Sequence, residues 1–205
     1  MTEHEMKELV VRQRTYFETG ATLPVNLRIT ALRKLYSAIS ANENAIHDAL
    51  KKDLGKSGFE SYMCETGLVL EEISYMLKHI RQFAREKRVH TPLSQFHSRS
   101  FQKPSPYGVV LIMSPWNYPF LLTLSPLADA LAAGNTAIVK PSAYSPYTSA
   151  ILQKILSQCF DPQYVAVVTG GRAENACLLR EHFDYIFFTG SQSVGKEVMR
   201  KASEH

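Results

Sequence analysis

The sequence has little of what marks several common classes of protein. Its 205 residues contain no apolar run long enough to span a membrane, and the polar, acidic start is unlike a signal peptide. Its three cysteines are an odd number without a C-x-x-C pair, which fits free thiols in a reducing compartment. The net charge of +4 is mild, and aromatic residues do not alternate with the basic ones, which argues against nucleic-acid binding. These absences predict a cytoplasmic protein that spans no membrane, and no metal site is expected.

What is present is typical of a soluble globular protein, with 45% hydrophobic and 20% charged residues. Residues 1–88 predict N-terminal helices, because apolar residues recur there at helical spacing, and we expect them to pack on the domain of residues 108–205 described below. Thr2 and Glu5 suit a capping box, Pro24 suits the first position of a helix, and Gly55 suits a helix end. The last of these helices is expected over residues 62–85.

Residues 89–107 predict an extended connector or an exposed hairpin. The stretch has three prolines and no helical period. Leu93, Phe96 and Phe101 indicate that it packs on something, such as a partner subunit.

Residues 108–205 predict part of a Rossmann-like domain, which makes the protein an α/β protein with a parallel sheet. Short apolar strands alternate here with helices, as in right-handed βαβ units. The expected strands are 108–113, 136–140, 164–170 and 184–189, and the expected helices are 121–133, 146–160, 173–180 and 194–202. Because ligands of such sheets bind beyond the carboxyl ends of the strands, the residues that follow each strand form the candidate site.

Small and polar residues follow these strands. Gly190 and Ser191 let backbone N–H groups approach an anion at the start of the next helix. Lys140 ends a strand, where it is either a cation for a ribose hydroxyl or a phosphate, or a solvated surface lysine. Asn117 is either an amide donor for a developing oxyanion or an ordinary turn-forming residue.

The segment from Gly190 to Lys196 matches G-x-x-x-x-G-K, the phosphate-binding loop of P-loop NTPases. Three features weaken that interpretation. Glu197 stands where Mg²⁺ binding needs Ser or Thr, the loop follows the fourth strand, and Asp184 precedes its strand instead of ending one. The G-x-G-x-x-G fingerprint is also absent. A degenerate ATPase is therefore a minor alternative.

Taken together, the segments SPWNYP (114–119), KPS (140–142) and FTGSQSVGKEV (188–198) resemble the aldehyde dehydrogenase superfamily. They occur in the family's order and spacing, and the resemblance spans nearly the whole chain. The chain is most similar to the shorter branch that accepts fatty and aromatic aldehydes. The resemblance implies the N-terminal portion of that family's α/β fold.

The resemblance also implies a cofactor, NAD or NADP, and roles for single residues. Asn117 would lend its side-chain amide to the oxyanion hole. Ser114 and Trp116 would border the nicotinamide half of the cofactor, and Lys140 and Ser142 would touch the adenosine ribose. The turn formed by Thr189, Gly190, Ser191, Val194 and Gly195 would lie against the pyrophosphate and adenine side. Ala143 stands where the family often carries a Glu that binds the adenine ribose, which makes NADP more plausible.

The family's catalytic Glu and nucleophilic Cys lie beyond the segments found here. Cys64, Cys159 and Cys177 all lack the nucleophile's sequence context. The expectation is therefore the N-terminal part of an enzyme that oxidises an aldehyde substrate, inactive by itself, and a homo-oligomer, most simply a dimer. The alternative is a non-catalytic module that binds a dinucleotide or pairs with other subunits.

Overall fold

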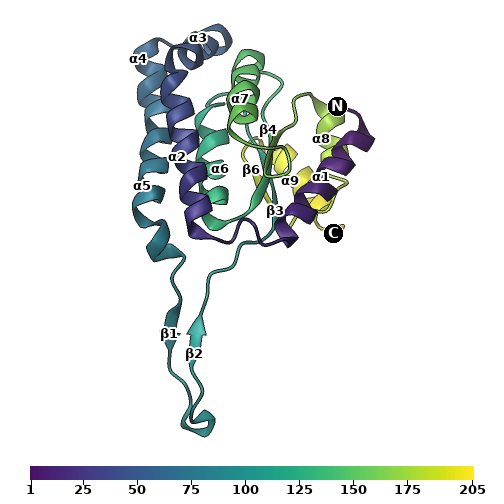
Figure 1. The fold of residues 1–205 in the computed structure, drawn as a ribbon. Coiled ribbons are helices and arrows are strands. Elements are labelled where there is room, and N and C mark those ends of the chain that lie inside the picture. The colour runs from purple at the N-terminus through teal and green to yellow at the C-terminus, as the bar shows by residue number, and fades with distance from the viewer.

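The computed structural model describes residues 1–205 and has the expected α/β architecture, with helices on both sides of a parallel sheet (Figure 1). The α-helices are α1 (Glu3–Glu18), α2 (Val25–Ala41), α3 (Glu43–Leu54), α4 (Gly58–Ser61), α5 (Gly67–Phe83), α6 (Leu121–Ala133), α7 (Pro146–Cys159), α8 (Arg172–Leu178) and α9 (Gln192–Ala202). A π-helical turn, η1 (Tyr62–Thr66), joins α4 to α5, and a 3-10 turn, η2 (Leu93–Gln95), lies in the hairpin described below. The strands are β1 (Lys87–Val89), β2 (Ser100–Gln102), β3 (Val109–Met113), β4 (Thr136–Lys140), β5 (Val165–Val167) and β6 (Tyr185–Phe188).

The main sheet has the order β5-β4-β3-β6, with all neighbouring strands parallel. The chain moves outward from β3 through β4 to β5 and then returns to add β6 on the other side of β3. The strand order therefore reverses between β3 and β6, which is where sheets of this kind form a ligand crevice. β6 is an edge strand.

Two hydrophobic cores cover the two faces of this sheet. Val110 and Ile112 of β3 belong to the larger core, together with residues of α2, α5, α6 and α7. Val109, Leu111 and Met113 belong to the smaller core, together with residues of α1 and α9. This alternation along one strand shows why VVLIM is apolar throughout: both faces of β3 are buried.

The N-terminal helices begin and end close to where the sequence predicted. The capping box is present, since Thr2 Oγ1 accepts from the Glu5 amide and Glu5 accepts from the Thr2 amide. Gly55 ends α3 at a φ of 71°. Pro24 is the residue before α2 instead of its first residue. None of the helices has both the length and the apolar character needed to cross a membrane.

The single helix predicted over residues 62–85 is wrong in one respect. The structure has α4, then the π-helical turn η1, then α5, which ends at Phe83. The amide of Gly67 donates to the carbonyl of Tyr62, five residues earlier. A Cβ at position 67 would lie 2.8 Å from that carbonyl oxygen, so glycine permits the wide turn.

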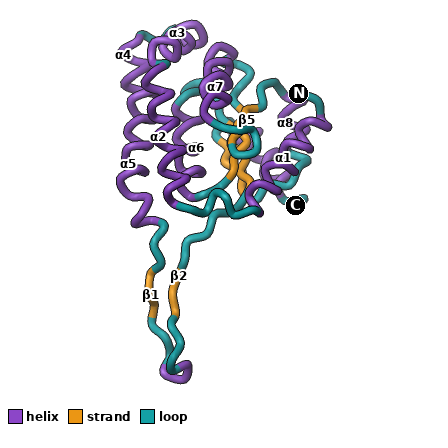
Figure 2. Tube along the Cα trace, viewed as in Figure 1, coloured by secondary structure: helices purple, strands orange, loops and turns teal.

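Residues 89–107 belong partly to a hairpin, which spans Lys87–Gln102, and partly to a connector without regular secondary structure, residues 103–107. β1 and β2 pair antiparallel, with Arg88 opposite Phe101. The hairpin extends away from the body of the molecule (Figure 2). Leu93 at its tip is 86% exposed. Contact with a partner subunit stays a prediction.

Asp184 ties α1 to the start of β6. Its carboxylate accepts from the amide of Val109 at 2.7 Å and from Arg14 Nη1 at 3.0 and 3.2 Å. We expect Asp184→Asn to lower the free energy of unfolding by about 1–2 kcal/mol, because it weakens three charge-assisted bonds at a partly exposed site. Urea unfolding measures this, with the exposed Asp48→Asn as the control. Equal stability of the two variants would contradict the prediction.

Candidate functional site

The carboxyl ends of β3, β4 and β6 lie next to one another. The amide of Ser114, just past β3, donates to the carbonyl of Lys140 at the end of β4, at 3.2 Å. The amide of Thr189, just past β6, donates to the carbonyl of Met113 at 3.0 Å. The sheet thus brings together three of the strand-end segments that the sequence singled out.

Ser114 is buried and supports the turn that follows β3. Its Oγ lies 2.6 Å from Thr123 Oγ1, which in turn donates to the carbonyl of Pro119 at 2.5 Å. Because Thr123 has one hydroxyl proton and gives it to Pro119, Ser114 is the donor of the pair. The hydroxyl of Ser114 therefore holds the turn closed between residues 114 and 119.

Trp116 and Asn117 lie at the surface of this turn. Trp116 is 53% exposed. The carbonyl of Asn117 accepts from Lys56 Nζ at 3.1 Å, while its side-chain amide has no hydrogen-bond partner within the protein. The backbone of Asn117 is thus held in place, and its amide is free to donate to a ligand.

Lys140 is 3% exposed, which excludes the solvated surface lysine. Its Nζ donates to the carbonyl of Gly170 at 2.7 Å and to that of Pro141 at 3.0 Å. Desolvation lowers the pKa of Lys140 to about 8, and the carboxylate of Glu174 counters part of that effect. An ammonium has three donors, so one remains for a ligand oxygen.

The residues after Lys140 form the start of the next connection. Ser142 is half-buried, and its carbonyl accepts from Ser149 Oγ at 2.9 Å. Ala143 is exposed and carries no polar group. No carboxylate therefore stands at this position.

Helix α9 begins directly after β6. Ser191 is its N-cap, and the hydroxyl oxygen accepts from the amide of Val194 at 3.4 Å. The first turn has no acidic residue, so the positive end of the helix dipole is not neutralised. Gly190 before it is exposed, and a Cβ there would lie 2.5 Å from the ring of Phe188. Gly195, on the same helix, is half-buried.

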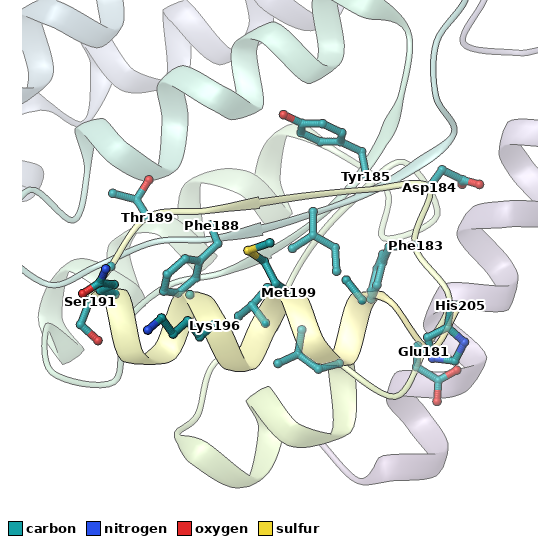
Figure 3. Close-up of a pocket in the computed structure, with 17 residues that line it drawn as sticks. Glu181, Phe183, Asp184, Tyr185, Phe188, Thr189, Ser191, Lys196, Met199 and His205 are labelled. Atoms are coloured by element: carbon teal, nitrogen blue, oxygen red, sulfur yellow. The ribbon is translucent and has the colours of Figure 1, made fainter.

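A cavity of about 940 Å³ lies beside β6 and α9 (Figure 3). Thr189 and Ser191 are at one end of it, and His205 and Glu181 are at the other. Neither Lys140 nor Asn117 lines it. It follows the free edge of β6, so it overlaps the strand-end site only at the turn before α9. We place the candidate site at the adjacent carboxyl ends of β4, β3 and β6, which carry or are followed by the cation, the amide and the helix start respectively.

Sequence reasoning missed two residues beside this site, Lys56 and Glu65. They form a buried ion pair with 2.5 Å between Lys56 Nζ and Glu65 Oε1. The helical spacing of apolar residues does not identify either residue as part of a site. The nearest signals are the glycines that precede Lys56 and follow Thr66, and neither indicates a charge pair.

Comparison with known proteins gives one consistent result. The model of the Aldehyde dehydrogenase family matches residues 1–205. A 4,4'-diaponeurosporen-aldehyde dehydrogenase of Staphylococcus aureus is 42% identical over 192 residues, which are 94% of this chain and 42% of that protein. Human aldehyde dehydrogenase family 3 member B1 is 43% identical over 194 residues, which are 95% of this chain and 42% of that protein.

The solved structures agree with this result. The substrate-bound state of Staphylococcus aureus AldH matches with a TM-score of 0.94 and 41% identity, over 96% of this chain and 43% of that one. The chain thus spans 42% of the length of each curated relative named above.

Proposed function

The chain belongs to the aldehyde dehydrogenase family, and we propose that it supplies the dinucleotide cradle and one oxyanion donor of an aldehyde-oxidising enzyme. The observation that carries the proposal is that three groups end or follow the neighbouring strands β4, β3 and β6, whose carboxyl ends are hydrogen-bonded to one another. These are the Lys140 ammonium, the free amide of Asn117 and the uncompensated start of α9.

The residues present fit NAD or NADP. The remaining donor of Lys140 suits a ribose hydroxyl or a phosphate oxygen, with Ser142 beside it. The start of α9 suits the pyrophosphate, because exposed N–H groups and a helix dipole both favour an anion there. Ser114 and Trp116 border the space proposed for the nicotinamide, which would supply the hydride acceptor when bound. The absence of a carboxylate at Ala143 leaves room for the 2′-phosphate of NADP.

Asn117 is the proposed catalytic residue of this chain. A side-chain amide without a partner can donate to the oxyanion that develops when a nucleophile attacks an aldehyde. Its backbone is already fixed by Lys56, so little reorganisation accompanies that step. Removal of one such donor typically costs about 100- to 1,000-fold in turnover.

The nucleophile and the general base are proposed to come from outside this chain. Cys64 lies in η1, Cys159 ends α7 and Cys177 lies in α8, so none stands at a strand end. Burial raises the pKa of the Cys159 thiol, which disfavours the reactive thiolate. We therefore expect no aldehyde oxidation from these residues alone.

The hairpin favours a second role in subunit pairing. Its tip carries the exposed apolar side chains of Leu93 and Phe96, well away from the cores. A homodimer that buries this tip is proposed, and it is compatible with the cofactor role. The P-loop alternative finds no support. Asp184 binds Arg14 at the amino end of β6, whereas Gly190 lies beyond the carboxyl end of the same strand.

Ser191 gives the sharpest test of the cofactor proposal. Asp and Asn are as good at an N-cap as Ser, so both variants should keep α9 intact. Only Asp adds a charge beside the proposed pyrophosphate position. We expect Ser191→Asp to weaken NAD+ and NADP+ binding by about tenfold or more, while Ser191→Asn stays close to the original affinity.

Isothermal titration calorimetry with NAD+, NADP+ and Mg-ATP measures these affinities. Thermal unfolding checks that both variants are folded. If the unmodified protein bound Mg-ATP and neither dinucleotide, the proposed function would be wrong. Equal affinities of the Asp and Asn variants would mean that the pyrophosphate does not bind at the start of α9.

A further inference from the structure

We propose that the buried ion pair of Lys56 and Glu65 is a positioning device for the turn that carries Trp116 and Asn117. The pair contacts neither the proposed cofactor residues nor the free amide of Asn117. It acts instead on the backbone of residues 117–121, from two sides. Its consequence for catalysis rests on the proposed function, whereas its effect on the turn does not.

The π-helical turn aims Glu65 into the protein. One extra residue in this turn shifts the side chains that follow it around the helix, and Gly67 allows the shift. Glu65 is 0% exposed as a result. A buried carboxylate is costly unless it is both paired and hydrogen-bonded, and Glu65 is both.

Glu65 binds the start of α6. Its Oε2 accepts from the amide of Phe120 at 2.8 Å and from that of Leu121 at 3.1 Å. These amides have no partner within the helix, and no side chain of the helix's own N-cap satisfies them. The carboxylate also stands at the positive end of the helix dipole.

Lys56 binds the other side of the same turn. Its Nζ donates to Glu65 and to the carbonyl of Asn117, and lies 4.1 Å from the centre of the Tyr118 ring. The pair therefore holds residues 117 and 118 through the cation and residues 120 and 121 through the anion. Between them the carbonyl of Pro119 accepts from Thr123 Oγ1, so the backbone is also held at residue 119.

The predicted role follows from this geometry. With both charges in place, the backbone of Asn117 is held in one position, and this limits the directions in which its side-chain amide can donate. Without Lys56 the Asn117 carbonyl loses its partner and the turn gains freedom, although the core beneath it stays packed. The pair would thus set the precision of the oxyanion donor without touching the reacting atoms.

Trp116 makes this testable, because it is the only tryptophan of the chain and lies in the turn itself. We would prepare Lys56→Met, Glu65→Gln and the double variant, and measure acrylamide quenching of Trp116 together with the thermal midpoint and the Kd for NAD+. Lys51→Met and Glu60→Gln are matched controls, since both side chains are exposed.

Each single variant should lower the thermal midpoint, since it leaves one buried charge unpaired. The double variant removes both charges and should regain most of that stability. If the pair positions the turn, quenching of Trp116 should stay about twofold higher in the double variant than in the unmodified protein. NAD+ affinity should also stay weaker, while both controls behave as the unmodified protein does.

A purely structural pair gives a different result. The double variant would then recover the original quenching and the original Kd together with its stability, and the inference would be overturned. If the unmodified protein bound no dinucleotide, the proposed function would fail, yet the quenching comparison would still decide the positioning role.

Discussion

Replacing Phe120 by alanine is expected to lower the free energy of unfolding by about 3–5 kcal/mol. Phe120 is 0% exposed and is among the largest fully buried side chains of the protein. Its ring packs in the larger core, which also contains Leu124 and Leu127 of α6. Truncation leaves a cavity that rigid helices on either side cannot close, so the lost packing adds to the lost burial.

Urea unfolding at neutral pH measures this change. Tyr144→Ala is the control, because that aromatic side chain is strongly exposed and its removal should change stability by less than about 0.5 kcal/mol. A loss below about 1 kcal/mol for Phe120→Ala would mean that the core beneath the turn is loosely packed or collapses readily.

The position of Phe120 also explains why this loss should reach the site. Phe120 follows directly on the turn of residues 114–119, and its amide binds Glu65. The core therefore holds the turn from below while the ion pair holds it from the side. We expect the alanine variant to shift the emission of Trp116 even under conditions in which the protein stays folded.

Local patterns were enough to predict most of the fold. VVLIM and TAIVK are apolar runs of strand length between glycine and proline signals, and both are strands buried on each face. Apolar spacing and the end signals at Thr2 and Gly55 located the first and third helices. These elements depend on neighbours in sequence, so the sequence alone defines them.

Other features depend on residues far apart in the chain. The strand predicted over residues 164–170 is only Val165–Val167, because pairing with β4 ends where the chain turns toward Gly170. The break in the helix predicted over residues 62–85 arises from the π-helical turn. That turn is stable because Glu65 meets partners 55 and 56 residues later, at Phe120 and Leu121. Helical periodicity carries no sign of such contacts.

The candidate site shows the same division. Its location beyond the strand ends followed from the alternation of strands and helices, and the structure brings Ser114, Lys140 and Thr189 together there. The burial and the bonding partners of each side chain could not be predicted from that alternation. The sequence left Lys140 as either a ligand-binding cation or a surface lysine, and burial excluded the second only once Gly170 was seen beside it.

Lys140→Met is expected to weaken dinucleotide binding by about 10- to 100-fold at pH 7, the size of a lost charge-assisted hydrogen bond. The reason is that this residue supplies the one cation held in place at the proposed ribose position. Calorimetric titration with NAD+ and NADP+ measures the change. Lys154→Met, on the exposed face of α7, is the control and should bind as the unmodified protein does.

The same lysine predicts opposite effects of pH on binding and on stability. Burial lowers its pKa to about 8 in the folded protein, whereas the unfolded chain keeps the proton up to about pH 10.4. Between these values the unfolded state binds more protons, so the contribution of Lys140 to stability rises with pH from about 8 to about 10. Over the same window the folded side chain loses its charge, and dinucleotide affinity should fall.

The methionine variant separates these two effects, since it removes the titrating group and keeps a side chain of similar length. Its affinity should be weak and nearly constant from pH 7 to about pH 9.5, whereas the affinity of the unmodified protein should decline toward the same value. Equal slopes in the two proteins would assign the decline to another group. A steep decline that is absent from the variant would identify Lys140 as a cation buried at a cost to folding and used for binding.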